Sequence, residues 1–428
     1  MKGIEEKQIE APYELPEGWK WDFAKNLADI YTGNSINEKL KQEKYLNQTE
    51  GLNFIATKDI DFDGAINYEN GVKINDYEKF KTAPKHTPLL CIEGGSAGRK
   101  LGFSEEEVCF GNKLCAFVCR DINPKLLYFY LQSNFFYHCF MKERHGLIGG
   151  VSVNTLKQIP FPLPPTLAEQ QRIVNRIESM FAKLDEAKEK AQNVVDGFET
   201  RKAAILHKAF TGELTAKWRK ENGVSDDSWE EKKLQEVCIK EITDGTHKTP
   251  TYVDEKTGVP FISGKDVSNE IIDWSDLRYI PKALHEEVYA RLAPQIDDIL
   301  LSKNGARLGK AAIVETNMIF DIYVTLALLR PNKKNIFPKY LWRVINSPSI
   351  QSQIQNHLTG IGMPNLHLRD IKALSMFVPT LPEQVEIVRI LDIIIEKENK
   401  AKQAAEAVLE QIDLLKKSIL ARAFRGEL

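Results

Sequence analysis

The sequence predicts an α+β protein with two domains that are separated by two long helices forming an antiparallel coiled coil. Three observations carry this prediction. Parts of the chain recur 214 residues later, each recurring part holds a long heptad stripe of apolar residues, and the remaining sequence mixes short β-rich runs with short helical patterns. A chain of 428 residues is long enough to form more than one hydrophobic core.

The internal repeat sets the domain boundaries. Residues 166–174 recur as 380–388, and residues 202–214 recur as 416–428. We therefore expect a first domain, a central coiled-coil helix, a linker, a second domain and a C-terminal coiled-coil helix. Their ranges, in this order, are 1–164, 165–214, 215–228, 229–379 and 380–428.

Within both domains, β-rich runs alternate with short helical patterns, punctuated by Gly, Pro and Asn. Helices are expected over Pro124–Leu131 and Pro338–Ile345. Each domain is therefore assigned to the α+β class. Strands are expected at Leu89–Ile92, Ala116–Val118, Ile299–Leu301 and Val324–Leu329.

Each recurring segment predicts one helix of about 44 residues, roughly 66 Å long. Thr166 and Thr380 each precede a glutamate by three residues, which predicts capping boxes. Gly212 and Gly426 are the corresponding stop signals. The apolar coiled-coil positions are Ile173, Ile177, Leu184, Val194, Phe198 and Ile205 in the first helix, and Ile387, Leu391, Val408, Ile412 and Ile419 in the second, with Arg201 and Glu398 as polar exceptions.

Two matching stripes in one chain favour mutual pairing over two separate core faces. The second domain joins the end of the first helix to the start of the second helix. A compact domain of about 150 residues is only about 40 Å across, so these two ends should lie closer than one helix length. This favours antiparallel pairing, although an extended 215–228 linker of about 46 Å leaves the parallel alternative open.

Composition and motifs exclude several classes of protein. The first residues lack an apolar stretch and no run of about 18 apolar residues occurs, so we expect a cytoplasmic protein that spans no membrane. The six cysteines form no C-x-x-C pair, which disfavours both a disulfide scaffold and a zinc site at Cys115, Cys119 and His138. Common nucleotide-binding, metalloprotease and hydrolase motifs are absent from the sequence, so we assign no catalytic residue and no metal site.

The net charge of −2 limits a nucleic-acid interface to local basic patches. Glycine-flanked basic turns occur at corresponding places in both repeats. Glycine lets backbone amides approach phosphates, and Arg, Lys and Asn reach base edges. For any single turn, a solvated hairpin loop remains the alternative. The candidate DNA-binding residues are Lys58, Gly95, Arg99 and Lys100 in the first domain, and His247, Lys248, Lys265, Lys303, Asn304, Arg307 and Lys310 in the second.

A set of short motifs runs along the chain. They are Leu15–Trp19, Asp244–Pro250, the Thr-Leu-x-Glu-Gln starts at Thr166 and Thr380, Gly360–Asn365, and the two Ala-Phe-x-Gly-Glu-Leu endings. Together they resemble the motifs of the specificity subunit of Type I restriction-modification enzymes, and the resemblance covers essentially the whole chain. The first domain departs from the second in one motif, since Tyr31–Asn34 stands where the second domain has Thr243–Thr246.

The resemblance implies a non-catalytic subunit with two target-recognition domains, each of which recognises one half of a bipartite, asymmetric site in double-stranded DNA. It also implies that the helices recruit two modification (methyltransferase) subunits and restriction (translocase and endonuclease) subunits. S-adenosylmethionine, ATP and Mg²⁺ would then be bound by those partners, and no cofactor by this chain. The alternative from another class is a non-catalytic coiled-coil scaffold that joins two protein-binding domains.

Overall fold

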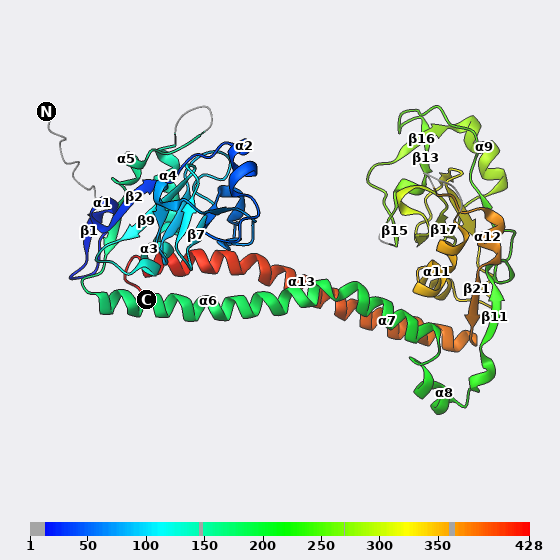
Figure 1. Ribbon diagram of the computed structural model, residues 1–428. Coiled ribbons are helices and arrows are strands. Elements are labelled where there is room, and N and C mark those ends of the chain that lie inside the picture. Colours follow the sequence, from blue (N-terminus) through cyan, green and yellow to red (C-terminus); the bar gives the residue numbers. More distant parts are fainter. Residues whose placement is uncertain (1–12, 145–148, 269, 359–363) are drawn as a thin grey trace. The chain divides into compact units, whose positions relative to one another are not determined.

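The computed structural model describes residues 13–144, 149–268, 270–358 and 364–428. The chain divides into two compact units (Figure 1). The first unit comprises Met1–Gln192 with Glu406–Leu428, and the second comprises Asn193–Ala405. Each unit therefore holds one sheet-containing domain together with part of both long helices.

The first domain contains a four-stranded antiparallel sheet of order β2-β9-β6-β7, a mixed sheet of order β4-β3-β8-β5 and the pair β1-β10. Its helices are α1 (Ala24–Leu27), α2 (Glu38–Leu40), α3 (Pro124–Leu131), α4 (Asn134–Lys142) and α5 (Val153–Leu156). Its strands are β1 (Lys20–Phe23), β2 (Ala28–Thr32), β3 (Leu52–Ile55), β4 (Lys73–Ile74), β5 (Thr82–Ala83), β6 (Pro88–Cys91), β7 (Leu101–Phe103), β8 (Val108–Phe110), β9 (Leu114–Cys119) and β10 (Pro160–Leu163).

The second domain repeats this plan with the sheets β12-β20-β17-β18 and β16-β13-β19 and the pair β11-β21, and adds the pair β14-β15. Its helices are α9 (Lys282–Arg291), α10 (Pro338–Ile345), α11 (Pro348–His357) and α12 (Leu368–Ala373). Its strands are β11 (Glu230–Lys233), β12 (Thr243–Asp244), β13 (Gly258–Ile262), β14 (Val267–Ser268), β15 (Ile271–Ile272), β16 (Arg278–Pro281), β17 (Ile299–Ser302), β18 (Ala311–Ile313), β19 (Asp321–Ile322), β20 (Leu326–Leu329) and β21 (Ser375–Val378).

These elements confirm the prediction of two α+β domains. The helices α3 and α10 have the predicted bounds, and β9 and β17 cover the strands expected there, whereas β6 begins and ends one residue before the expected Leu89–Ile92. The strand expected from Val324 begins at Leu326 instead, because the backbone N–H of Val324 donates to the carbonyl of Thr246 outside the β20 ladder. The Gly360–Asn365 motif lies outside the described residues except for its last two positions.

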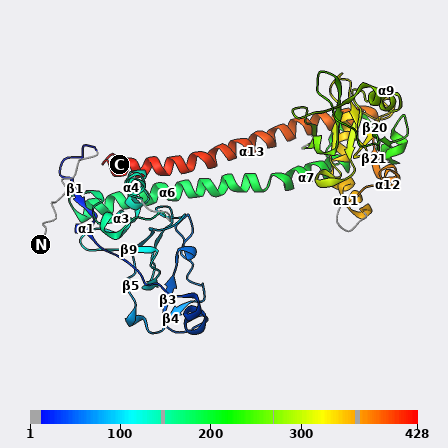
Figure 2. The same ribbon diagram turned by 90° about the horizontal axis from the view of Figure 1, so that it is seen from above.

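The long helices are α6 (Leu167–Asp196), α7 (Phe198–Phe210) and α13 (Leu381–Ala423). Within each unit, antiparallel pairing is confirmed by contacts between residues whose numbers add to nearly the same total (Figures 1 and 2). In the first unit, Lys416 Nζ lies 2.5 Å from Asp185 Oδ1. In the second unit, Arg201 Nε lies 2.7 Å from Glu398 Oε2. The two polar exceptions in the predicted stripes are thus ion-pair partners.

The expectation of one uninterrupted first helix is wrong, because α6 and α7 are separated at Gly197. Glycine has the weakest helix propensity after proline. The backbone bonds from Gly197 N to Asn193 O (3.1 Å) and from Arg201 N to Gly197 O (3.0 Å) keep the helical direction. The predicted linker also contains a helix that the sequence analysis did not identify, α8 (Ala216–Asn222).

One predicted coiled-coil position needs correction. Val408 is 39% exposed, whereas Ile412 and Ile419 are 2% and 8% exposed. Lysine ammonium groups also lie beside aromatic rings of the helix pair. Lys402 Nζ lies 4.9 Å from the ring centroid of Phe198, and Lys416 Nζ lies 5.1 Å from that of Phe181. Leu409, the residue after Val408, is half-buried, so the predicted stripe lies one position too early around Val408.

The start of each long helix belongs to the core of the adjacent domain. Ile173 and Ile177 pack in the first domain's core, and Ile387 and Leu391 pack in that of the second. A buried glutamine reinforces each junction through backbone atoms. Gln170 Oε1 accepts from Asn123 N at 2.8 Å. Gln384 Oε1 accepts from Phe337 N at 2.7 Å, while its amide donates to the carbonyls of Asn335 and Pro379.

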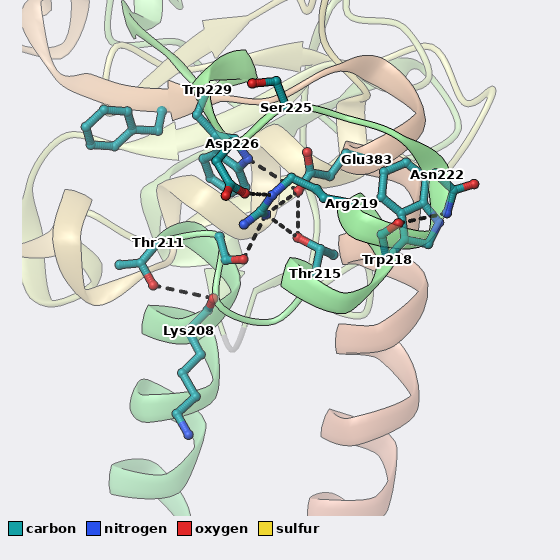
Figure 3. Close-up of polar contacts among 12 residues, drawn as sticks. Lys208, Thr211, Thr215, Trp218, Arg219, Asn222, Ser225, Asp226, Trp229 and Glu383 are labelled. Atoms are coloured by element: carbon teal, nitrogen blue, oxygen red, sulfur yellow. Dashed lines mark hydrogen bonds and ion pairs between the residues drawn. The ribbon is translucent and has the colours of Figure 1, made fainter.

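The preceding glutamates differ between the helices. The N-cap bond from Glu169 N to Thr166 Oγ1 is present at 3.2 Å, and the half-buried Glu169 carboxylate binds the exposed Arg172. Glu383 is instead fully buried, where its Oε1 accepts from Thr215 Oγ1 at 2.6 Å and from Arg219 Nη1 at 2.7 Å (Figure 3). This buried network ties the residues that follow α7 to the start of α13.

Candidate nucleic-acid interface

The basic turn of the second domain is the connection between β17 and β18. Two backbone bonds close it, from Gly309 N to Ser302 O (2.8 Å) and from Ser302 N to Lys310 O (2.9 Å). Gly305 and Gly309 have φ values of +77° and +81°, a region that favours glycine. Arg307 and Lys310 are exposed on this turn, and no ion pair is found for either side chain within the described residues.

A 3-10 helix at Gly264–Asp266 lies beside this turn. Thr325 connects the two elements, because its Oγ1 accepts from Gly264 N at 2.8 Å and its carbonyl accepts from Lys303 N at 2.9 Å. The arrangement places Lys265 and Arg307 near the same acid, Asp273. The pKa of Asp273 is lowered, first by hydrogen bonds from Ser275 and further by the charges of Arg307 and Lys265.

Lys303, at the base of the turn, is 7% exposed and its ammonium binds Asp244 Oδ2. The other carboxylate oxygen of Asp244 lies 3.2 Å from His247 Nε2. A charge this deeply buried needs such a partner. Direct contact of Lys303 with DNA does not fit this burial, and the lysine instead fixes the strand that leads into the exposed turn.

The first domain builds the same turn between β6 and β7. The backbone bonds from Gly98 N to Cys91 O (2.8 Å) and from Cys91 N to Lys100 O (2.9 Å) correspond to those of the second domain. Lys100 Nζ donates to Thr57 O at 3.2 Å, on the equivalent 3-10 helix that carries Lys58. Arg99 and Lys100 both lie over the ring of Phe62, which is 65% exposed.

A glycine directly follows β2 in the first domain and β12 in the second, and a close approach of the backbone requires it at both places. A Cβ atom on Gly33 would lie 1.9 Å from Phe110 O, and one on Gly245 would lie 2.0 Å from Ile322 O. Equivalent bridges, Asn34 with Gly111 and Thr246 with Tyr323, follow these glycines. Tyr31–Asn34 and Thr243–Thr246 are therefore structurally equivalent, as their alignment in the sequence suggested.

The predicted DNA-binding residues thus gather around one turn and one 3-10 helix in each domain. In the second domain, several are already bound to acids. Lys248 Nζ lies 2.8 Å from Glu287 Oε1. Burial, the largest single effect, lowers the pKa of Lys265, but the carboxylates of Asp266 and Asp276 together outweigh it and the pKa is raised. The candidates that lie exposed are Lys58, Gly95, Arg99, His247, Lys248, Lys265, Arg307 and Lys310, while Lys100 and Asn304 are half-buried.

Sequence reasoning missed three residues at these turns. Asn365 forms a β-bridge with Asn304, which places the end of the Gly360–Asn365 motif beside the second turn. Arg144 Nη2 donates to Gly94 O at 3.1 Å, and Phe62 supports the first turn. The glycine-rich motif was a signal for Asn365, whereas an isolated arginine or phenylalanine gave none.

Within the ranges that the structure covers, no group of three or more His, Cys, Asp or Glu side chains is arranged to hold a metal ion. No helix in the same ranges is long and apolar enough to cross a membrane.

Comparison with known proteins agrees with the duplicated architecture. The family model described as Type I restriction modification DNA specificity domain matches residues 16–195 and again residues 226–411. The chain belongs to this family. It is accordingly a non-catalytic specificity subunit of a Type I restriction-modification system, concerned with recognition of a DNA target.

Known specificity subunits match this chain over nearly its full length. The EcoBI specificity subunit of Escherichia coli is 24% identical over 100% of this chain and 90% of its own length. The EcoKI specificity subunit of Escherichia coli strain K12 is 24% identical over 97% of this chain and 90% of its own. The crystal structure of the HsdS subunit from Thermoanaerobacter tengcongensis shares the fold, with a TM-score of 0.65, 20% identity, and coverage of 98% of this chain and 100% of that one.

Proposed function

We propose that each target-recognition domain presents its basic turn and adjacent 3-10 helix to double-stranded DNA, and that the two domains recognise different halves of a bipartite, asymmetric target. The observation that supports this most is the duplication of the turn on one backbone plan with different side chains. Phosphate contacts by Lys and Arg give affinity, while contacts to base edges give specificity. Different side chains on the two turns therefore imply different half-sites.

In the second domain, Arg307 is the proposed base-contacting residue and Lys310 the proposed phosphate-contacting residue. Arginine pairs with the guanine edge through two hydrogen bonds. Arg307→Ala should weaken binding by about 1 to 3 kcal/mol and relax the preference at one position. Lys310→Ala should weaken binding to all sequences alike and lower the salt slope by about one.

The test measures affinity by fluorescence anisotropy against duplexes in which each half-site is randomised separately. Lys334→Ala, on an exposed turn that precedes α10, is the matched control and should leave affinity unchanged. If Arg307→Ala disturbs both half-sites equally, the two domains are not independent. If binding does not fall as salt rises, the chain is not a DNA-binding subunit and the scaffold alternative gains support.

We further propose that the chain docks two modification subunits and the restriction subunits of the same system. S-adenosylmethionine, ATP and Mg²⁺ would then be held by those partners. Support comes from the family membership and from the paired helices, which are long and carry mixed charge. Mixing the purified chain with the modification subunit and measuring the mass of the complex by light scattering tests both association and stoichiometry.

A further inference from the structure

A cavity of about 610 Å³ opens in the second unit between the end of α7, the helices α10 and α11, and the strands β11 and β21. Its wall is largely apolar, with Leu206, Phe210, Ile350, Met376 and Phe377 among the lining residues. Phe377 is 52% exposed. None of the lining residues belongs to the basic turn or to the 3-10 helix beside it, although α11 also holds the turn, since Gln351 Nε2 donates to Gly309 O at 2.7 Å.

The corresponding place in the first unit is filled by Tyr13. Its ring packs edge-on against Trp21 at 4.9 Å and against Phe135 at 5.7 Å between ring centroids. Its hydroxyl donates to the carbonyl of Phe424 at 2.9 Å. Arg425 lies over the same ring at 5.7 Å. Tyr13 therefore completes an aromatic cluster at the end of α13.

The internal repeat shows that the two places are equivalent. Strand register aligns Trp21 with Glu231, because they pair with Pro162 and Phe377 in β10 and β21. The first residues of α4 and α11 align Phe135 with Ser349. The matching helix ends align Phe424 and Arg425 with Phe210 and Thr211. All four second-unit residues, Glu231, Ser349, Phe210 and Thr211, line the cavity.

No tyrosine is among the described residues that line this cavity. Tyr340 is buried behind it, where its ring packs edge-on against Phe210 and its hydroxyl donates to Phe377 O. The chain that leads into β11 instead forms α8 and directs Arg219 to the buried Glu383 (Figure 3). Smaller or charged side chains have also replaced the aromatic ones, as in Ser349 and Glu231. A cavity with room for an aromatic ring remains.

A buried hydroxyl in this cavity points to a polar ligand group. Ser347 is 1% exposed and lines the cavity, yet its Oγ has no hydrogen-bond partner within the described residues. The equivalent Ser133 accepts from Phe136 N at 3.2 Å. Unsatisfied buried hydroxyls are uncommon and call for a partner. At the rim, the exposed carboxylate of Glu231 favours a positive charge nearby.

We propose that this cavity is a docking site for a partner protein that inserts a tyrosine from an extended segment, with a basic residue beside it. The ring would occupy the place that Tyr13 fills in the first unit, and its hydroxyl would meet the carbonyl of Phe210 or the hydroxyl of Ser347. The inference rests on the proposed function in one respect, since the modification subunit is the partner to be tested.

The chemistry of the site is tested with p-cresol, the side chain of tyrosine. In the full chain labelled with ¹³C at methionine methyl groups, p-cresol should shift the Met376 resonance with a dissociation constant on the order of 1 mM. Ser349→Phe should abolish the shift by filling the cavity, and Ser349→Ala should retain it. An unchanged Met376 resonance in the parent chain would overturn the proposal.

The partner is tested by alkylation of the Ser349→Cys variant with N-ethylmaleimide, followed site by site with mass spectrometry. Bound modification subunit should slow alkylation of the introduced thiol at least tenfold, and should not protect Thr257→Cys on an exposed loop. Association is measured separately by light scattering. If the subunit associates but gives no protection, this inference fails while the proposed function stands.

Two further outcomes are decisive. Protection that appears without the subunit and grows with chain concentration would identify a second copy as the occupant and overturn the proposal. Failure of the subunit to associate at all would overturn both the proposed function and this inference.

Discussion

The two recognition domains have the same backbone at the basic turn but different side chains beneath it. In the second domain, Asp244 and Lys303 form a buried ion pair. In the first domain, Thr32 stands at the position of Asp244, and Ile92 stands at the position of Lys303. The second equivalence follows from two matching backbone bonds, from Val151 N to Ile92 O and from Leu366 N to Lys303 O. Both members of the pair differ together, so neither charge is left alone. The same backbone therefore accommodates either a buried ion pair or two uncharged side chains, provided that both members of the pair are replaced together.

The largest expected difference between the halves concerns the glutamates at the helix starts. Arg219→Ala should destabilise the second unit by about 3 to 5 kcal/mol, because it leaves the carboxylate of Glu383 buried without its cation. The equivalent glutamate of the first unit is paired with the exposed Arg172, and Arg172→Ala should cost at most about 1 kcal/mol. Urea unfolding measures both. Equal effects would show that the buried network does not stabilise the second unit.

The glycines that follow β2 and β12 should respond alike to substitution in the two domains. Gly33→Ala and Gly245→Ala place a Cβ against a backbone carbonyl, which we expect to cost about 3 kcal/mol each. Gly95→Ala is the matched control, because a Cβ there meets nothing within 4 Å. Thermal unfolding followed by circular dichroism should show a lower Tm for the first two variants only. A normal Tm for Gly245→Ala would contradict the close approach seen here.

A double-mutant cycle at Asp244 and Lys303 tests whether the two members of the buried ion pair must be replaced together. Lys303→Ile should destabilise the second domain by about 3 kcal/mol because it leaves the carboxylate of Asp244 buried without its cation. Adding Asp244→Thr, which reproduces the pair of the first domain, should recover most of that loss. The double-mutant cycle is measured by urea unfolding. Additive losses would mean that the two positions are not coupled.

The smallest expected difference concerns equivalent valines of the coiled coil. Val194 is half-buried, so Val194→Asp should cost about 1 kcal/mol or more. Val408 is 39% exposed, so Val408→Asp should stay within about 0.5 kcal/mol. Ile412→Asp, at a buried position, should be much more damaging. Circular dichroism measures the helix content and Tm of the three variants and so gives their ranking. A large loss of stability in Val408→Asp would show that Val408 belongs to the buried apolar stripe after all.

Local patterns were enough to predict much of the fold. The bounds of α3 and α10 follow from short helical patterns, and the pairing of the long helices follows from two stripes that must be covered. The break at Gly197 escaped the heptad pattern because a glycine between apolar positions does not interrupt it. The displacement around Val408 escaped because Val408 and Leu409 are both apolar, so the pattern alone does not tell which of the two is buried.

At the candidate site, the sequence located the turns but not the state of their side chains. Lys303 is a basic residue among glycines, like Arg307, yet it is buried because Asp244 lies opposite it after folding. Those two residues are 59 positions apart, so local patterns carry no information about their contact. Tyr13 and the cavity are visible only when the two repeats are compared in space, since neither motif nor charge distinguishes them.

The glutamine at each helix start bears on how such a chain changes over generations. Gln384 binds Phe337 N, Asn335 O and Pro379 O, and Gln170 binds Asn123 N and Pro164 O. Every one of these partners is a backbone atom, so any residue provides the carbonyls and any residue except proline provides the two N–H groups. The attachment of a domain to its helix through this glutamine therefore places little demand on the identity of the domain's residues at those points. A domain exchanged by recombination between genes would keep this attachment, and only the apolar contacts with the start of the helix would have to fit anew.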